Sequence, residues 1–335
     1  MQAALYVTAV EEEIQALLAE QDPALTPFYG MVRYHLGWVD ENLQPIKARG
    51  GKRIRPLICL LVCEAISGDY RPALPAAAAV ELIHDFSLIH DDIEDKSPRR
   101  RGRATVWHVW GVPQAINAGD GLLALAHLAL HRLSAPGGSP KLLSQATQLL
   151  NQACLDLCEG QYLDIAFQEH TDVTLEMYLT MAGKKTGSLL ECAAHLGAIL
   201  ATREKRIIQA YRGFARNLGL AFQITDDLLG IWGEEERTGK GVGEDIKAGK
   251  KSLPVVYAFE EERRRGQRRL EEIYGEANLD ALLAILEELE VKARCQERAR
   301  HFQKRALEEL ERTGIDNRAQ GRLRDLALFL VERPF

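Results

Sequence analysis

The chain has 335 residues, 46% of them hydrophobic, so it can bury a large core in one large domain or in two ordinary ones. A formal net charge of −6 excludes a general nucleic-acid binder, because such proteins carry a basic excess. The cysteines lack the CxxC spacing of a zinc knuckle. Glutamates stand at positions 11–13, where a signal peptide would need apolar residues, and the most apolar stretches are shorter than the ~20 residues of a membrane span. We therefore expect a cytoplasmic protein without a membrane span.

Helical periodicity runs through nearly the whole sequence. Apolar residues recur every three or four positions, whereas strict alternation is rare, so the sequence predicts an all-α fold. Clusters of Gly, Pro and polar turn residues separate the expected helices at Asp22-Pro23, Gly50-Gly51, Gly68 to Pro72, Ser97 to Gly102, Ala135 to Pro140, Gly233 to Gly249 and Tyr274-Gly275. No repeat and no long linker divides the chain, so we expect one domain over residues 1–335.

An acidic cluster ends an apolar helix in the first third of the chain. The run from Ala77 to His90 leads into Asp91, Asp92 and Asp95, with Asp91 and Asp95 on one helical face. Like charges one turn apart destabilise a helix by roughly a few tenths of a kcal/mol, so the grouping has no structural benefit. A bound cation would explain it, and a solvated helix end is the alternative.

A second apolar helix, expected from about Ile207 to Leu229, ends in a similar way at Asp226 and Asp227. Oxygen ligands without His or Cys partners select a hard cation, and carboxylates that share substrate phosphates are the usual way in which magnesium is held. The two clusters together predict more than one Mg²⁺ ion.

Basic residues accompany both acidic clusters in this otherwise acidic chain. The run from Arg99 to Arg103 follows the first cluster, and guanidinium groups bind phosphate oxygens bidentately, so we interpret it as a diphosphate site rather than a solvated loop. Gly50 to Pro56 is a second basic segment, without the spacing of a nucleotide P-loop. A glycine-rich, lysine-bearing loop from Thr238 to Pro254 follows the second cluster, and it is either a closing phosphate loop or a mobile surface connection.

In order and spacing, the motifs from GGKRIRP at Gly50 to GKKSLP at Gly249 resemble those of the all-trans isoprenyl diphosphate synthases, and the pattern is closest to geranylgeranyl and farnesyl diphosphate synthases. The resemblance covers the functional two-thirds of the chain. It implies a single-domain helical bundle around a central apolar cavity, and a homodimer. It also implies a magnesium-dependent prenyltransferase that holds about three Mg²⁺ ions with bound diphosphate and condenses isopentenyl diphosphate with an allylic diphosphate.

The resemblance assigns a role to each matching residue. The metal ligands would be Asp91, Asp92, Asp95, Asp226 and Asp227. The isopentenyl diphosphate site would contain Lys52, Arg55, His84 and Arg101. The allylic diphosphate site would contain Arg100, Lys185, Lys250 and Lys240. Thr186 and Gln223 match positions near the developing carbocation, and Gln161 and Asp164 match a further polar motif that faces the cavity.

Two positions bear on activity and product. Gly230 stands where the family's second motif usually has a third aspartate, so Asp226 and the later Asp245 would hold an ion with reduced affinity. Phe86 lies five residues before Asp91, about 7.5 Å along a helix, and with the small Ser87 beside it resembles the tunnel floor of geranylgeranyl diphosphate synthases. We expect a twenty-carbon product, with farnesyl diphosphate as the alternative product and plain core packing as the alternative role of Phe86.

Two rival functions share the expected fold. A class I terpene cyclase would have the acidic clusters but no need for a second diphosphate site, which Lys52, Arg55 and His84 indicate. A non-catalytic subunit of a heteromeric prenyl synthase would explain Gly230. The complete first cluster, the arginines and the lysine loop favour a condensing enzyme.

Overall fold

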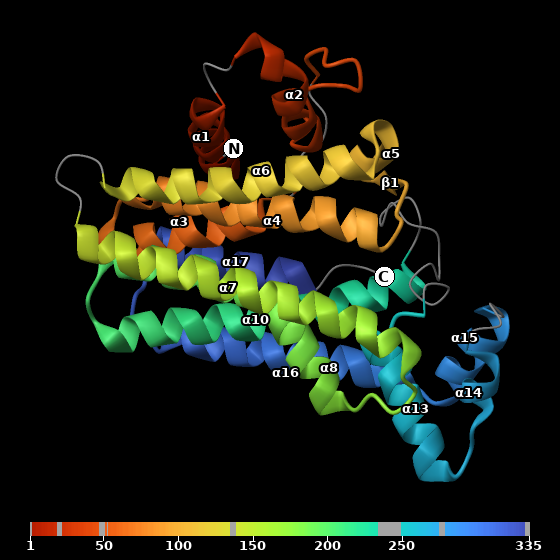
Figure 1. Cartoon of the computed structure of the whole chain (residues 1–335). Coiled ribbons are helices and arrows are strands. Elements are labelled where there is room, and N and C mark those ends of the chain that lie inside the picture. Colours follow the sequence, from red (N-terminus) through yellow and green to blue (C-terminus); the bar gives the residue numbers. More distant parts are fainter. Residues whose placement is uncertain are drawn as a thin grey trace. The chain divides into compact units, whose positions relative to one another are not determined.

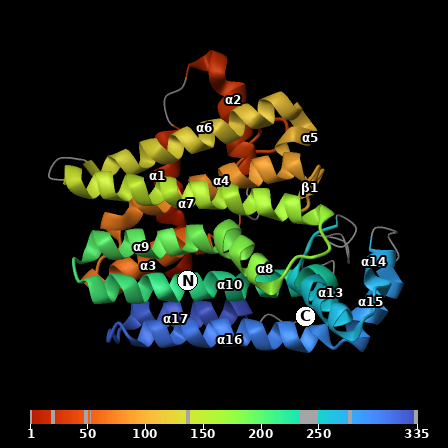
Figure 2. The ribbon, with the colours of Figure 1, turned by 60° about the horizontal axis from the view of Figure 1, so that its bottom comes forward.

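The structure is a computed structural model that describes residues 2–18, 22–46, 51, 53–134, 139–233, 249–274 and 279–331. Figures 1 and 2 show helices throughout these residues, and two strands of two residues each, β1 (Arg99–Arg100) and β2 (Arg103–Ala104), form a small antiparallel hairpin. The all-α prediction is confirmed.

The chain divides into two compact units by the contacts between its Cα atoms. Unit 1 contains Met1–Asn151 and Cys192–Arg203, and unit 2 contains Gln152–Glu191 and Glu204–Phe335. The boundaries fall inside α7 (Pro140–Ala166) and α9 (Ser188–Ala201), so each unit holds part of both helices. The organisation as one domain stays a prediction.

Unit 1 is built around α4 (Leu74–Glu94), which packs against α6 (Val112–His131) and α3 (Ile54–Ser67). The three helices run side by side in Figure 1. Four consecutive alanines at positions 76–79 of α4 are fully buried, and their small side chains let neighbouring helices approach closely. The other elements of this unit are α1 (Gln2–Leu17), η1 (Pro23–Leu25), α2 (Thr26–His35), η2 (Arg71–Ala73), α5 (Val106–Trp110) and η3 (Arg132–Ser134).

Unit 2 is built around α10 (Lys205–Trp232), which packs along α16 (Val291–Glu311). A π-helical turn, η5 (Gly183–Gly187), joins α8 (Leu175–Ala182) to α9 and also packs on α10. Gly219 of α10 permits this approach, because a Cβ there would lie 2.7 Å from the Cα of Gly187. The other elements of this unit are η4 (Phe167–Glu169), α13 (Leu253–Arg265), α14 (Arg269–Ile273), α15 (Leu279–Glu288) and α17 (Arg318–Val331).

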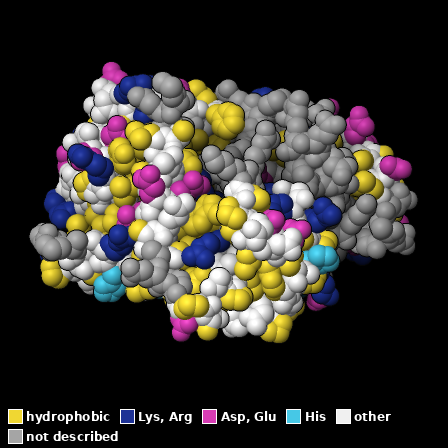
Figure 3. Space-filling view, turned by 90° about the horizontal axis from the view of Figure 1, so that it is seen from above, with side chains coloured by type: hydrophobic (Ala, Val, Ile, Leu, Met, Phe, Trp, Pro, Cys, Tyr) yellow, Lys and Arg dark blue, Asp and Glu magenta, His cyan; other side chains and the backbone are white. Residues whose placement is uncertain are grey.

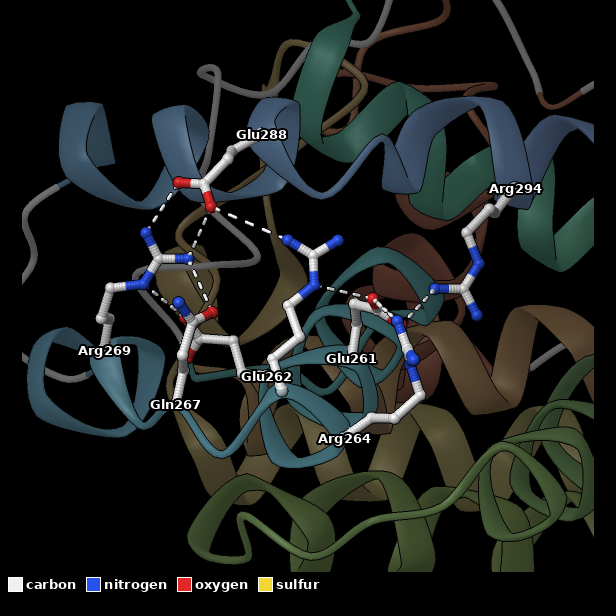
Figure 4. A network of polar contacts seen from close by, with 8 residues as sticks. Glu261, Glu262, Arg264, Gln267, Arg269, Glu288 and Arg294 are labelled. Carbon is white, nitrogen blue, oxygen red and sulfur yellow. Dashed lines mark hydrogen bonds and ion pairs between the residues drawn. The ribbon is translucent and has the colours of Figure 1, made fainter.

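Charged side chains join the short helices α13, α14 and α15 of unit 2 (Figure 4). Glu262 is buried and accepts hydrogen bonds from the backbone N–H of Leu270 over 2.7 Å and from Nε of Arg269 over 2.9 Å. Arg269 also donates to Glu288 over 2.7 Å. The buried carboxylate is therefore paired, as burial of a charge requires.

One described helical stretch, Arg71–Glu94, is long and apolar enough to cross a membrane by length and composition alone. The protein itself buries 78% of its most apolar window, as in the core helix of a globular protein. The cytoplasmic location stays a prediction.

Candidate active site

The first acidic cluster occupies the last turn of α4, in unit 1. Asp91 and Asp95 are half-buried, and the backbone N–H of Asp95 donates to the carbonyl oxygen of Asp91 over 2.8 Å. Asp92 is 2% exposed and accepts a 2.8 Å hydrogen bond from Nε of Arg100. Burial raises the pKa of Asp92 despite this arginine. The cluster is therefore divided between a buried aspartate turned onto Arg100 and two more accessible ones.

The donor atoms of this cluster suit a hard cation. Carboxylates offer only oxygen atoms, which Mg²⁺ prefers. In the part of the chain that the structure describes, no three His, Cys, Asp or Glu side chains are grouped so that they could hold a metal ion by themselves. Because Mg²⁺ usually keeps waters and binds substrate phosphates, the cluster fits a cation that is coordinated together with a diphosphate.

A cationic group surrounds His84 of α4, two turns before Asp91. Nη1 of Arg55, at the start of α3, lies 3.1 Å from Nε2 of His84 on α4, and the ring nitrogen must accept because a guanidinium has no lone pair. Burial, together with Arg55 and Arg101, holds the pKa of His84 well below its usual value, so its imidazole is neutral at pH 7. Its Nδ1 then carries the proton and can donate to an anion.

Arg101 completes this group from the hairpin of β1 and β2. Its guanidinium lies against Gly51, where a Cβ would be only 2.7 Å from Nη2. Burial lowers the pKa of Arg101, and neighbouring cations lower it further. The cation stays protonated at pH 7, since an arginine side chain is not deprotonated in proteins. A cation held among other cations favours a bound anion, as expected for a diphosphate site.

Sequence reasoning missed Arg53, which lies between the predicted binding residues Lys52 and Arg55. Its side chain is buried, and Nη1 donates to Glu81 over 2.7 Å and to Asp85 over 3.0 Å. Its backbone is left-handed, with φ of 48°, which a non-glycine residue adopts at a cost. The basic run GGKRIRP contains no signal that Arg53 is buried. In the sequence, Arg53 looks the same as Lys52 and Arg55, which are predicted to bind substrate.

Phe86 and Ser87 precede the cluster on α4. Phe86 is buried, and its ring packs edge-on against the ring of His90 with 4.8 Å between centroids. Ser87 is also buried, and its hydroxyl donates to the carbonyl oxygen of His84 over 2.8 Å. Both residues are thus packed within unit 1, about one helical turn before Asp91.

The second acidic cluster lies near the end of α10, in unit 2. Asp226 is half-buried, whereas Asp227 is only 8% exposed. The buried Tyr178 donates its hydroxyl to Oδ2 of Asp227 over 2.7 Å, and Nε2 of Gln223 donates to Oδ1 over 2.8 Å. Gly230 offers no carboxylate, so this cluster contributes fewer oxygen ligands than the first.

The π-helical turn η5 presents Lys185 and Thr186. Nζ of Lys185 lies 2.5 Å from Oδ2 of Asp164, and the Thr186 hydroxyl donates to Oε1 of Gln223 over 2.5 Å. Gly160 of α7 is required by the packing, because a Cβ there would lie 2.2 Å from the backbone nitrogen of Lys185. Single-turn π-helices often occur at functional sites. The structure therefore brings these predicted residues together, with the nearby Gln161 also buried.

The lysine loop is described only at its end. Lys250 is half-buried, and its carbonyl oxygen accepts a 2.6 Å hydrogen bond from the hydroxyl of Tyr274. Lys251, which sequence reasoning did not single out, is 3% exposed and donates to carbonyl oxygens of Gln168 over 2.8 Å and Gly249 over 3.1 Å. Burial lowers the pKa of Lys251 to about 8.

The predicted site residues thus fall into three sets. Those in unit 1 are Arg55, His84, Phe86, Asp91, Asp92, Asp95, Arg100 and Arg101. Those in unit 2 are Gln161, Asp164, Lys185, Thr186, Gln223, Asp226, Asp227 and Lys250. Lys52, Lys240 and Asp245 lie outside the described residues.

These features define a class of helical proteins with aspartates at the ends of apolar helices and cationic groups beside them. Residues 37–289 match the family model described as "Polyprenyl synthetase". The chain is 38% identical over 322 residues to the (2E,6E)-farnesyl diphosphate synthase of Mycobacterium tuberculosis, covering 93% of this chain and 87% of the relative. It is 42% identical over 252 residues to the geranylgeranyl pyrophosphate synthase of Geoglobus acetivorans, covering 75% and 74%.

A solved structure agrees with the sequence relatives. The geranylgeranyl pyrophosphate synthetase of Pyrococcus horikoshii superposes with a TM-score of 0.87 and 35% identity, covering 99% of this chain and 98% of that one. The chain therefore belongs to the polyprenyl synthetase family, which confirms the resemblance seen in its motifs. It is an enzyme, a prenyltransferase of the isoprenyl diphosphate synthase class.

Proposed function

We propose that this prenyltransferase condenses isopentenyl diphosphate with an allylic diphosphate and makes geranylgeranyl diphosphate. The observation that carries the proposal is the presence of two separate features beside α4 that suit a diphosphate. Half-buried carboxylates end the helix at Asp91 and Asp95, and the cationic group of Arg55, His84 and Arg101 lies two turns earlier. One feature suits a diphosphate that arrives with a metal, and the other suits a diphosphate bound directly, so the enzyme has use for two diphosphate substrates.

The cationic group would bind isopentenyl diphosphate. Arg55 and Arg101 supply charge, and neutral His84 supplies an Nδ1–H donor whose tautomer is set by the contact with Arg55. Lys52 retains the same role as a proposal from the sequence. Positive charge held in place before the substrate arrives costs little reorganisation when the diphosphate binds.

The acidic clusters would hold magnesium. We assign Asp91, Asp92 and Asp95 in unit 1 and Asp226 in unit 2 to this role, with about three ions in the complete complex. When bound, Mg²⁺ would neutralise the charge that develops on the departing diphosphate. Lys185 and Lys250 in unit 2, and Arg100 beside Asp92 in unit 1, keep the roles in allylic diphosphate binding that the family resemblance implies.

The reaction is balanced without a nucleophilic side chain. The allylic C–O bond breaks and the diphosphate leaves with the electron pair, while the double bond of isopentenyl diphosphate supplies the pair for the new C–C bond. Transfer of one proton to the released diphosphate then forms the double bond of the product. The oxygen atoms of Thr186 and Gln223, which hydrogen-bond to each other, would offer dipoles to the allylic cation.

We propose that Phe86 limits the length of the prenyl product. Its buried ring lies about 7.5 Å along α4 from Asp91, where it would form the floor below the growing chain. Phe86→Ala should shift the products from twenty carbons to longer chains, measured by chromatography of the dephosphorylated alcohols. An unchanged product would refute the floor. Farnesyl diphosphate is the second candidate, because the Mycobacterium tuberculosis relative that covers 93% of this chain is named for that product.

The isopentenyl diphosphate site is tested by Arg55→Lys. A lysine keeps the charge but loses the contact with His84, so we expect the KM for isopentenyl diphosphate to rise about tenfold and the KM for the allylic substrate to change less than about twofold. Arg71→Lys, whose side chain is 74% exposed, is the matched control and should match wild type. Equal increases in both KM values would refute a dedicated site.

We also propose a homodimer that forms through α6. Val112 and Ile116 lie one turn apart on this helix and are 40% and 42% exposed, and hydrophobic side chains gather on the face shown in Figure 3. Exposed apolar patches commonly mark association surfaces. Light scattering should give twice the chain mass for wild type and the chain mass for Ile116→Glu. A monomeric wild type would refute the proposal.

A further inference from the structure

Asp226 and Asp227 are neighbours in the sequence but lie in different surroundings. Asp226 is half-buried, whereas Asp227 is buried among α8, α10 and α13. Both match metal-binding positions of the family, so the sequence gives them the same role. Their hydrogen-bond partners in the structure indicate different roles.

Three donors from three helices bind the Asp227 carboxylate. Oδ2 accepts from the Tyr178 hydroxyl over 2.7 Å and from the backbone N–H of Leu253 over 2.8 Å, and Oδ1 accepts from Nε2 of Gln223 over 2.8 Å. Leu253 is the first residue of α13, where an N–H has no partner within the helix. A carboxylate only accepts hydrogen bonds, so the Tyr178 hydroxyl is the donor in this contact. Hydrogen-bond donors of the protein thus satisfy both oxygen atoms of the Asp227 carboxylate.

The contact with Asp227 also fixes the orientation of the Gln223 amide. A carboxylate can only accept, so the NH₂ group of Gln223 must face Asp227 and its oxygen must face away. That oxygen is the atom to which the Thr186 hydroxyl donates over 2.5 Å. If Asp227 were an amide, Gln223 could rotate and present its NH₂ group to Thr186 instead.

We propose that Asp227 is a positioning residue, which orients Gln223 and Thr186 and anchors the start of α13, whereas Asp226 keeps the metal-binding role that the proposed function gives it. This inference rests on the proposed function, because it assigns parts within the same reaction. Asp92 of the first cluster is also buried, but its hydrogen-bond partner is the cation Arg100 rather than the neutral donors that surround Asp227, and it keeps the metal-binding role proposed above.

The test compares Asp226→Asn with Asp227→Asn. We expect Asp226→Asn to raise the Mg²⁺ concentration for half-maximal turnover about tenfold or more. Asp227→Asn should lower kcat about tenfold or more, with the half-maximal Mg²⁺ concentration within about twofold of wild type. Tyr178→Phe should lower kcat in the same direction by a smaller factor, again without a change in Mg²⁺ requirement. Asp172→Asn, whose side chain is 81% exposed, is the surface control.

A binding measurement separates this inference from the proposed function. The unfolding midpoint of each variant is followed against Mg²⁺ in the presence of inorganic diphosphate, without turnover. The Mg²⁺-dependent rise should persist in Asp227→Asn and Tyr178→Phe and weaken in Asp226→Asn. An equal weakening in both aspartate variants would overturn the inference even if the enzyme is active. Absence of turnover by wild type would overturn the proposed function. The comparison of the unfolding midpoints would still test the different roles of Asp226 and Asp227.

Discussion

Replacement of Arg53 by methionine should strongly destabilise unit 1. Arg53 faces two carboxylates that are almost fully buried, with Nη1 at 2.7 Å from Glu81 and 3.0 Å from Asp85. Burial alone would raise the pKa of Asp85, but Arg53 and His35 hold it below its usual value. Burial raises the pKa of Glu81, although Arg53 opposes that change.

The expected loss follows from this burial. Removal of one partner from a buried ion pair costs about 3–5 kcal/mol, because the remaining charge is left without compensation. We expect a loss of that size in the free energy of unfolding at pH 7, measured by urea denaturation. Arg71→Met, in an exposed pair with Asp69, should leave the urea midpoint close to that of wild type.

A multiple variant separates charge from packing. Adding Glu81→Gln and Asp85→Asn to Arg53→Met removes both uncompensated charges and should recover part of the lost stability. A loss below about 1 kcal/mol for Arg53→Met alone would refute the reasoning, because the carboxylates would then not depend on this arginine. A triple variant less stable than the single one would show that packing rather than charge dominates.

Three further predictions concern unit 2 and its lysines. Gly160→Ala should lower kcat at least about tenfold, because its Cβ would lie 2.2 Å from the Lys185 nitrogen, whereas Gly187→Ala should match wild type in steady-state assays since nothing lies within 3.9 Å. Lys251 has a folded-state pKa of about 8, below the unfolded value near 10.4, so the unfolded state binds more protons between these pH values. The unfolding free energy of wild type should therefore rise by about 2 kcal/mol from pH 8 to pH 10 relative to Lys251→Met, and a flat difference would contradict the burial of a charged lysine. Tyr274→Phe, which removes the hydrogen bond to the Lys250 carbonyl, should raise the KM of the allylic substrate about threefold and leave that of isopentenyl diphosphate unchanged.

The helices were predictable because clusters of Gly, Pro and polar turn residues mark their boundaries in the sequence. The break predicted at Gly68 to Pro72 falls between α3 and α4, and the break at Ala135 to Pro140 falls before α7. Glycine and proline act through local backbone sterics, which the sequence displays directly. Interruptions within helices were harder to foresee, since the π-helical turn at Gly183–Gly187 depends on packing against Gly160 and Gly219 from distant parts of the chain.

The chemistry of the site was predictable by residue type but not by orientation. Aspartate motifs indicated a magnesium site, yet nothing in the sequence shows that Asp92 is turned onto Arg100 or that Asp227 receives three donors. Arg53 and Lys251 look like their neighbours in the basic motifs, and only tertiary packing makes them buried cations. Burial is a property of the fold, so sequence reasoning gave neither of these two residues a role.

The most direct test of condensation is to measure diphosphate release and incorporation of labelled isopentenyl diphosphate in the same reaction. Purified wild-type protein is incubated with Mg²⁺ and with each allylic diphosphate in turn, with and without isopentenyl diphosphate. We predict that both signals require Mg²⁺ and both substrates, appear in equal amounts, and yield a linear twenty-carbon alcohol after dephosphorylation. Diphosphate release from the allylic substrate alone with a cyclic product, or absence of both signals, would contradict the proposed condensation.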